Sequence, residues 1–326
     1  MIDKLPEGKL NNDLLKKLFL DINNPNSKNP KIGEDSAEID ITNNNEILVS
    51  SDPITFDTDN PGGFLIDICS NDIFASGGIP KWILITCLVP LNTSFEELRK
   101  SLINLSHNAT LNDIDIVGGH TEVTSAVNKI IISGTIIGIY NKNFTKKQKI
   151  KPNQDIILGG LAGIEGSKII SSKLKKFKKE VKILHENSKD LSLSIKKIAL
   201  CATKSGKVIK MHDPTEGGVA TALHEITELG NVGCEIKFEK IEFVENFQKI
   251  CTLLGINPLG VISSGCLIII SDSENSRKII NEFKKNKIPS SVIGKTTKKE
   301  KGNIIIKDNS FLELERFDQD EIIKIF

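Results

Sequence analysis

The sequence predicts a two-domain protein of the α/β (α+β) class. With 326 residues the chain is too long for one ordinary domain. In both halves, apolar segments with the composition of strands alternate with segments of helical period. A polar, lysine-rich segment without periodicity, 140–154, separates the halves. We therefore expect an N-terminal domain over residues 1–150 and a C-terminal domain over residues 151–326.

Composition and charge exclude several classes of protein. The 43 Lys+Arg residues nearly balance 42 Asp+Glu residues, which does not favour a nucleic-acid partner. The longest mostly apolar stretches, 82–91 and 130–139, are shorter than the ~20 residues that a membrane span needs. The first residues show no basic segment followed by an apolar one, as a secretory signal would. We expect a cytoplasmic protein with no nucleic-acid or membrane partner.

The first half begins with leucines at helical spacing and continues with short strands and longer helices. Ser94 and Glu97 have the spacing of a capping box, and Leu98, Leu102 and Leu105 form an apolar stripe behind them. In order, we expect a helix over 11–20, a strand over 46–51, a helix over 63–76, a strand over 81–89, the capped helix, and strands over 114–117 and 129–139, with a glycine turn at 118–122.

The second half repeats the alternation. The lysine run 173–182 is predicted to be a solvated helix face, and Gly230 is predicted to end a helix whose apolar stripe includes Val219, Leu223 and Ile226. In order, we expect a strand over 155–158, a glycine-rich segment with a helix after it, a helix near 191–202, a helix from 218, and strands over 234–238, 266–271 and 291–293.

Five segments join glycine to acidic, amide or hydroxyl residues at the ends of predicted elements. Carboxylates that converge from separate elements can hold Mg²⁺, and glycines let backbone N–H groups approach phosphate oxygens. Asp72 is the most informative position, because it interrupts an apolar helix stripe. Taken singly, each segment is more often a simple turn. The segments are Gly33–Asp35, Ser50–Asp52, Asn71–Asp72, Gly118–Glu122 and Asp213–Gly218.

Other common sites are not encoded. The chain has no GxxxxGK(S/T) phosphate loop, no GxGxxG fingerprint and no GxSxG nucleophile elbow. His107, His185 and His224 lie among helical residues, which favours structural roles. His120 and His212 adjoin the glycine segments, where they are either proton carriers or phosphate contacts, or else structural.

In chain order, five segments resemble the AIR synthase (PurM-like) superfamily, and the likeness covers nearly the whole chain. They are Gly33–Ala37, Ser51–Ile54, Asn71–Pro80, Gly118–Glu122 and Asp213–Gly218. The superfamily includes aminoimidazole ribonucleotide synthase, selenophosphate synthetase, thiamine-monophosphate kinase and the hydrogenase maturation factor HypE. The Asp213–Gly218 and Ile164–Gly166 segments are most similar to HypE and to the AIR synthase-related proteins.

The resemblance implies a PurM-like fold, with an N-terminal α/β domain that forms a homodimer through its strands and a C-terminal α/β domain. It also implies ATP and Mg²⁺ as cofactors. The implied metal ligands are Asp35, Asp52, Asp72 and Glu122. The implied nucleotide-binding residues are Asn71, Gly118, Gly119, Thr121, Thr215, Gly217 and Gly218. The implied catalytic residues are His120, His212 and Asp213.

The implied reaction is the phosphorylation of a carbonyl, carboxamide or phosphate oxygen, on a small molecule or a protein-borne group, in a biosynthetic or metalloenzyme maturation pathway. The alternatives are a small-molecule kinase resembling thiamine-monophosphate kinase and a nucleotide-binding maturation or scaffold protein without catalysis.

The chain departs from the family pattern at three places. His120 stands where several relatives carry an acid, which leaves open whether Glu122 or Thr121 takes that contact. HypE modifies a C-terminal cysteine, whereas this chain ends Ile325-Phe326, so we do not expect that self-modification. The first cysteine is Cys69, within a predicted helix, which disfavours selenide chemistry.

Overall fold

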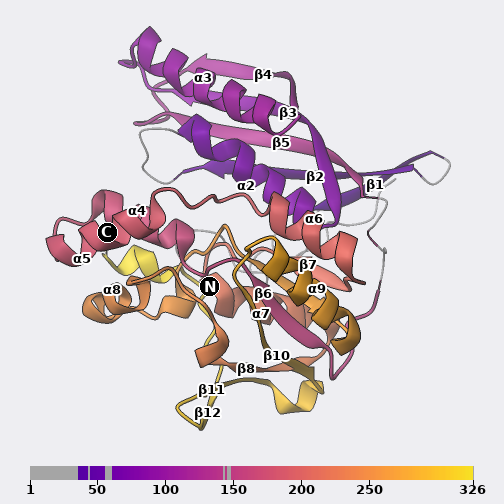
Figure 1. Ribbon diagram of the computed structural model, residues 1–326. Coiled ribbons are helices and arrows are strands. Elements are labelled where there is room, and N and C mark those ends of the chain that lie inside the picture. The colour runs from indigo at the N-terminus through magenta and orange to yellow at the C-terminus, as the bar shows by residue number, and fades with distance from the viewer. Residues whose placement is uncertain (1–35, 43–44, 56–60, 142–143, 145–147, 326) are drawn as a thin grey trace, which may run out of the picture. The chain divides into compact units, whose positions relative to one another are not determined.

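The computed structural model describes residues 36–42, 45–55, 61–141, 144 and 148–325 (Figure 1). These residues form two compact units, one comprising the described residues of 36–144 and the other those of 148–325. We call them the N-terminal unit and the C-terminal unit. The helix predicted over 11–20 and the predicted metal ligand Asp35 lie outside the described residues.

The N-terminal unit is built on a five-stranded sheet with the order β1-β2-β5-β3-β4. Strand β4 runs parallel to β3, and the other neighbours are antiparallel. The strands are β1 (Ala37–Thr42), β2 (Asn45–Ile54), β3 (Gly78–Val89), β4 (Asp115–Val123) and β5 (Ile131–Tyr140). The strands predicted over 46–51, 81–89 and 129–139 are therefore confirmed.

Two helices, α2 (Pro61–Ala75) and α3 (Phe95–Leu111), pack against each other and cover one face of this sheet (Figure 1). Strand β3 shows the consequence, because Ile83 and Cys87 are fully buried whereas Trp82 and Leu84 are 39% and 40% exposed. We call the side of Ile83 and Cys87 the helix-covered face and the side of Trp82 and Leu84 the open face.

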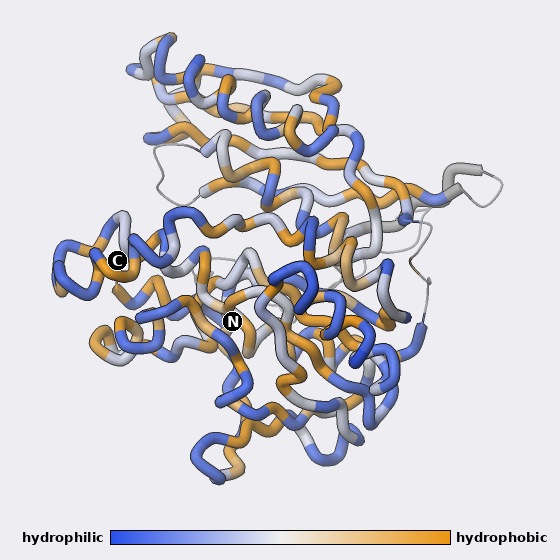
Figure 2. Tube along the Cα trace, viewed as in Figure 1, coloured by the Kyte–Doolittle hydropathy of each residue, from blue (hydrophilic) through white to orange (hydrophobic). Residues whose placement is uncertain are grey.

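Helix α3 begins as the capping residues predict. Ser94 has an extended backbone, and its Oγ accepts a hydrogen bond from the Glu97 backbone N–H at 3.2 Å. Leu105 and Ala109 face the core, while most of the helix is polar. Figure 2 shows this alternation of hydrophilic and hydrophobic residues along α3. The cap satisfies one of the backbone donors that a helix leaves unpaired at its start.

The turn predicted at Gly118–Glu122 is wrong, because these residues belong to β4. From Gly118 onwards, β4 pairs residue by residue with β3, after a register shift at Val117. Gly119 adopts φ +152, and a Cβ there would lie 1.9 Å from the Ile85 carbonyl oxygen. The glycine therefore serves a close approach of two strands rather than a reversal of the chain.

The C-terminal unit contains a seven-stranded sheet with the order β12-β11-β8-β10-β6-β9-β7. The central strands β6 and β9 are buried along their whole length. The strands are β6 (Asp155–Gly159), β7 (Lys210–His212), β8 (Gly233–Lys237), β9 (Leu267–Ser271), β10 (Ser290–Thr297), β11 (Asn303–Lys307) and β12 (Ser310–Glu313).

Helices cover both faces of this sheet. On one face, the predicted stripe of α7 packs with Ile156 and Leu158 of β6 in one core. On the other face, a Cβ at Gly159 would meet Phe283 of α9 and Ile198 of α6. The helices are α4 (Ile164–Lys173), α5 (Lys178–Ser188), α6 (Lys196–Ser205), α7 (Gly218–Gly230), α8 (Phe247–Leu254) and α9 (Ser273–Lys285), with 3₁₀ turns η1 (Phe238–Lys240), η2 (Pro258–Gly260), η3 (Lys299–Lys301) and η4 (Glu321–Ile325).

Two predicted helix ends differ from the structure. The lysine run is not one helix, because α4 ends at Lys173 and α5 begins at Lys178, after Phe177 in a left-handed conformation. Helix α7 includes Gly230, and Asn231 takes the left-handed position after it, which Asn tolerates better than most side chains. In the described parts of the chain, no helix combines the length and apolarity that crossing a bilayer requires.

Candidate functional site

In the N-terminal unit, two carboxylates from different elements meet at one hydroxyl. Strand β2 presents Ser50 and Asp52, two residues apart and therefore on the same face, while α2 contributes Asp72. The Ser50 hydroxyl donates to Asp72 and lies 3.4 Å from Oδ2 of Asp52. The pKa of the nearby Cys69 thiol is raised well above its usual value by burial and by the charges of both aspartates. The structure thus brings Asp52 and Asp72 together.

Asn71 precedes Asp72 on α2 but lies deeper in the unit. Its side chain is fully buried, whereas Asp72 is half-buried. Successive residues of a helix point in directions about 100° apart, which explains why neighbours differ in exposure. The described unit therefore exposes Asp72 but not Asn71 to a ligand.

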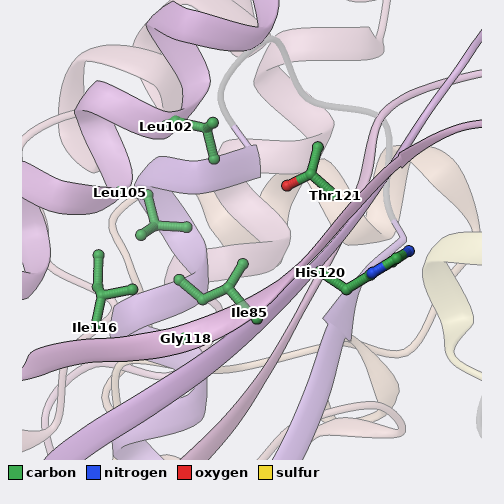
Figure 3. A pocket seen from close by; sticks show the side chains of 8 residues that line it. Ile85, Leu102, Leu105, Ile116, Gly118, His120 and Thr121 are labelled. Carbon is green, nitrogen blue, oxygen red and sulfur yellow. The ribbon is translucent and has the colours of Figure 1, made fainter.

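A cavity of about 260 Å³ lies between α3 and the edge of the sheet (Figure 3). Apolar side chains form one side of it, and the backbone of Gly118 and Gly119 forms the other. Its lining residues are Ile85, Leu102, Leu105, Ile116, Gly118, Gly119, His120 and Thr121. Gly118 and Gly119 are exposed positions of β4 and carry no side chain, so the backbone there is accessible to a ligand. Apolar walls beside accessible backbone groups suit a flat organic ring joined to a polar group.

Strand register relates this cavity to the two aspartates. Asp52 pairs with Gly134, Gly134 with Ile85, and Ile85 with Gly119. These residues form one transverse row across four strands, so Asp52 and Gly119 are separated by three strand spacings, or about 14 Å. Because directly paired residues point to the same side of a sheet, the aspartates and the cavity share the helix-covered face.

His120 and Glu122 belong to the open face. They pair with Thr86 and Leu88, and His120 Nε2 lies 3.6 Å from Oε2 of Glu122. Both side chains are more than half exposed, and in Figure 3 the His120 ring points away from the apolar lining of the cavity. The structure does not bring Glu122 together with Asp52 and Asp72.

In the C-terminal unit, His212 and Asp213 end β7 and begin the Asp213–Gly218 turn. Both are almost fully buried. His212 Nε2 lies 2.8 Å from Oε2 of Glu225, a residue of α7. This pairing fixes the orientation of the imidazole ring beside the turn.

The turn itself ends in two glycines with left-handed backbones, Gly217 at φ +77 and Gly218 at φ +63. The Gly218 N–H donates to the Thr215 carbonyl at 2.9 Å. The Gly217 N–H donates to Oδ2 of Asp320 at 2.8 Å. A backbone donor at the start of α7, of the kind that commonly binds anions, is therefore occupied by a carboxylate of the same chain.

Sequence reasoning missed two carboxyl groups beside this turn, Glu165 and Asp320. Burial raises the pKa of each carboxyl to about 7, and neighbouring negative charges raise it further. Hydrogen bonds to the carboxylates lower the pKa values; for Glu165 the donor is the Ser264 hydroxyl. Oε2 of Glu165 is buried without a hydrogen-bond partner. The Gly163–Gly166 segment gave a signal for Glu165, since glycines flank it, whereas no motif surrounds Asp320.

Fold and site together define a class: a two-domain α/β protein whose N-terminal unit places paired carboxylates and open glycine backbone on one face of a sheet. Comparison with known families gives the particular family. Residues 33–140 match the N-terminal domain of the AIR synthase related proteins, and residues 151–307 match their C-terminal domain. The chain belongs to the AIR synthase-related family, as the sequence predicts.

Similar curated proteins include a hydrogenase expression/formation protein and several carbamoyl dehydratases. A hydrogenase expression/formation protein of Methanocaldococcus jannaschii is 28% identical over 311 residues, which cover 91% of each chain. The carbamoyl dehydratase HypE of Escherichia coli is 23% identical over 262 residues, covering 76% of this chain and 75% of HypE.

Solved structures agree on the fold. HypE in its complex with HypF superposes with a TM-score of 0.78 at 21% identity, over 93% of this chain and 99% of HypE. A complex named AaThiL with AMPPCP and TMP superposes with a TM-score of 0.71 at 19% identity, over 93% and 94% of the two chains. The predicted PurM-like fold is confirmed.

Proposed function

We propose that this protein is an ATP-dependent enzyme that transfers the γ-phosphoryl group to an oxygen of a carboxamide, carbonyl or phosphate substrate. One observation carries the proposal: Asp52 and Asp72 converge on Ser50, on the same face of the sheet as the cavity, and Asp52 lies in the same row as the exposed backbone position of Gly119. Family membership supports it, as does the solved complex of HypE with ATP, which has a TM-score of 0.72.

The nucleotide would lie along the helix-covered face. The apolar residues Leu102 and Leu105 suit the base, and the Gly118 and Gly119 backbone suits the phosphates. Phosphoryl transfer depends on positioning and on charge neutralisation, which rigid strand backbone and paired carboxylates provide without a protein nucleophile.

The donor set of the paired aspartates fits Mg²⁺. Among the described residues, no group of three His, Cys, Asp or Glu side chains could hold a metal ion. Mg²⁺ in nucleotide sites is commonly held by one or two carboxylates together with phosphate oxygens, so the pair suffices. Asp52 and Asp72 would hold the ion, which supplies charge neutralisation at the phosphates. Asp35 stays a predicted third ligand.

A carboxamide carried by a partner protein is the substrate class that the relatives favour. Several are named carbamoyl dehydratases, and HypE has been solved in complex with HypF. The predicted roles of His120, His212 and Asp213 belong to this proposal. Of these, Asp213 lies near the Glu165 carboxyl, whose pKa burial raises to about 7, so that Glu165 can exchange a proton near neutral pH.

We also propose a homodimer formed by the open face of the N-terminal sheet. Trp82, Leu84 and Ile139 are each about 40% exposed there, and β4 forms one edge of this sheet. An exposed apolar sheet with a free edge is a common site of association. A light-scattering mass equal to one chain would contradict the dimer.

The central experiment compares the wild type with Asp72→Asn. The amide keeps an acceptor for the Ser50 hydroxyl but removes the charge that the metal requires. We expect Mg-ATP to raise the Tm of the wild type and to be hydrolysed with a carboxamide substrate, and we expect Asp72→Asn to lose at least about 100-fold of this activity. Asp115→Ala, at an exposed position of the same unit, is the matched control.

The products separate the alternatives. Release of inorganic phosphate supports activation of a carboxamide or carbonyl oxygen, whereas a stable phosphorylated product identifies a kinase. Stabilisation by ATP without turnover on any of these substrates would indicate a nucleotide-binding scaffold. Identical ATP stabilisation in wild type and Asp72→Asn would remove Asp72 from the site.

A further inference from the structure

The last described residues of the chain, Leu314–Ile325, lie across the start of α7, and we call them the C-terminal strap. The Phe317 backbone bonds Thr221 Oγ1 in both directions, at 3.1 and 3.2 Å. Oε2 of Glu321 accepts from the Asn257 backbone N–H at 2.9 Å. The strap is thus held to α7 and η2 at several points besides Asp320.

Glycine at position 260 is required for this close packing. A Cβ on Gly260 would lie 2.6 Å from the Phe317 ring and 2.7 Å from Cγ of Glu321. At Gly217, a Cβ would lie 2.9 Å from the Phe317 carbonyl oxygen. The strap therefore fits a surface without side chains, which a Cβ at either glycine would push away.

The central contact of the strap is the Asp320 carboxylate. Its Oδ2 accepts from the Gly217 N–H at 2.8 Å, its Oδ1 accepts from the Ile322 N–H at 2.9 Å, and the Ile262 backbone also bonds it. Asp320 is only 3% exposed. These backbone bonds hold the carboxylate in place but supply no positive charge.

The groups that face this contact are acidic. Glu165 is surrounded by Asp213, Glu216 and Asp320, with the Ser264 hydroxyl as its hydrogen-bond partner, and Glu216 also faces Asp320. Two thiols complete the surroundings: Cys251 faces Asp320 and Glu321, and Cys266 faces Asp213. Lys324 bonds Glu321 from an exposed position.

A buried carboxylate without a nearby cation is costly in its charged form, and like charges raise that cost. Oε2 of Glu165 has no hydrogen-bond partner and is buried. A proton is the smallest cation that can neutralise such a cluster without opening it. Uptake of protons at Glu165 and Asp320 thus favours the docked strap, and their loss favours its release.

We propose that residues Leu314–Ile325 form a proton-dependent strap over the α7 glycine turn, docked when Glu165 and Asp320 are protonated and loosened when both are ionised. Release frees the Gly217 N–H for an anionic ligand. The strap is a property of the C-terminal unit alone and does not depend on the proposed activity.

The sign and size of the effect follow from the pKa values. Both carboxyls have a pKa of about 7 in the docked state, above the ~4 of a free carboxyl, so docking is favoured at low pH and lost as the pH rises through 7. Each carboxyl should raise the opening constant about tenfold between pH 6 and pH 8.

Hydrogen exchange measures this opening directly. The exchange rates of the Gly217 and Ile322 amides, divided by their intrinsic rates at each pH, are compared with those of β9 between pH 6 and pH 8 on the full chain without nucleotide. We expect the strap amides to lose protection about tenfold or more and to be less protected than β9 at every pH, because buried β9 exchanges only when the whole unit unfolds. Strap protection equal to that of β9, or unchanged strap protection in the wild type, would overturn the strap.

Two variants test whether Glu165 and Asp320 are the groups whose protonation controls the strap. Glu165→Gln and Asp320→Asn keep hydrogen-bond acceptors but do not ionise, so each should reduce the pH dependence of strap exchange by about tenfold. Glu313→Gln, at an exposed position of β12, should leave it unchanged. Wild-type pH dependence in both Glu165→Gln and Asp320→Asn would contradict the assignment. Because no ATP is present, failure here says nothing against the proposed function.

Discussion

Two glycine pairs, each with a Thr-Glu dipeptide close by in the sequence, have opposite environments in this molecule. Gly118 and Gly119 lie in an exposed edge strand, where a Cβ on Gly118 meets open space. Gly217 and Gly218 lie in a buried turn, under a carboxylate from the end of the chain. The first pair leaves backbone groups accessible to a ligand, whereas the second has its donor already occupied. A glycine pair beside polar residues therefore indicates that another group approaches the backbone closely, but it does not reveal which group.

The largest expected difference between the two pairs is in stability. In Gly218→Ala, the new Cβ would lie 2.4 Å from the Leu259 carbonyl oxygen and 2.5 Å from that of Val261, at a φ of +63. Backbone strain and overpacking together should lower the free energy of unfolding by about 3 kcal/mol or more. Urea unfolding followed by circular dichroism measures this. A loss below about 1 kcal/mol would show that the turn is not rigidly packed.

The buried carboxyls should make stability depend on pH in the C-terminal unit. The pKa of Glu165 is raised to about 7, above its ~4.3 in the unfolded chain, so its contribution is complete below about pH 4 and is lost as the pH rises through 7. From pH 5 to pH 8, the free energy of unfolding should fall by about 2 to 3 kcal/mol through this group. Glu165→Gln should flatten the profile in urea melts at each pH.

The same experiment has a clear contrary outcome. If Glu165→Gln follows the wild-type profile between pH 5 and pH 8, Glu165 does not carry the titration. Glu122→Gln is the matched substitution in the N-terminal unit, where the side chain is exposed, and it should leave the profile of the C-terminal unit unchanged because it lies in the other compact unit.

The smallest expected effect is that of Gly118→Ala. Its Cβ meets no atom within 4 Å, so the free energy of unfolding should change by less than about 0.5 kcal/mol. The affinity for Mg-ATP should also change little, because Gly118 pairs with Leu84 and its methyl group would project to the open face, away from the phosphates proposed on the helix-covered face. Calorimetry of ATP binding checks this, and a clear loss of affinity would place the phosphates on the open face.

Local patterns predicted much of the fold. The Ser94 cap, the α7 stripe and the apolar strands β3, β5, β6 and β9 depend on short-range periodicity and turn chemistry, and all are confirmed. The glycines of β4 led to the wrong prediction of a turn, because a close approach between strands requires glycine as much as a turn does. Only the position of the partner strand distinguishes a close strand approach from a turn.

The candidate site was predictable where a charge breaks an apolar pattern. Asp72 interrupts an apolar helix stripe, and in the structure it accepts a hydrogen bond from the Ser50 hydroxyl, which also bonds Asp52. Glu122 was grouped with them because sequence order does not reveal which side of β4 a residue occupies; that depends on the register with β3. Asp320 could not be found, since its importance comes only from contact with a turn 103 residues away.

By itself, the sequence determined the alternation of elements, the family and the paired aspartates, because these depend on periodicity and on ordered local motifs. The tertiary structure alone decided which carboxylates share a face of the sheet. It also decided that Gly118 and Gly119 are exposed, whereas the C-terminal strap covers Gly217. The reason is physical: register, burial and the proximity of like charges are set by residues far apart in sequence, and they exist only once the chain has folded.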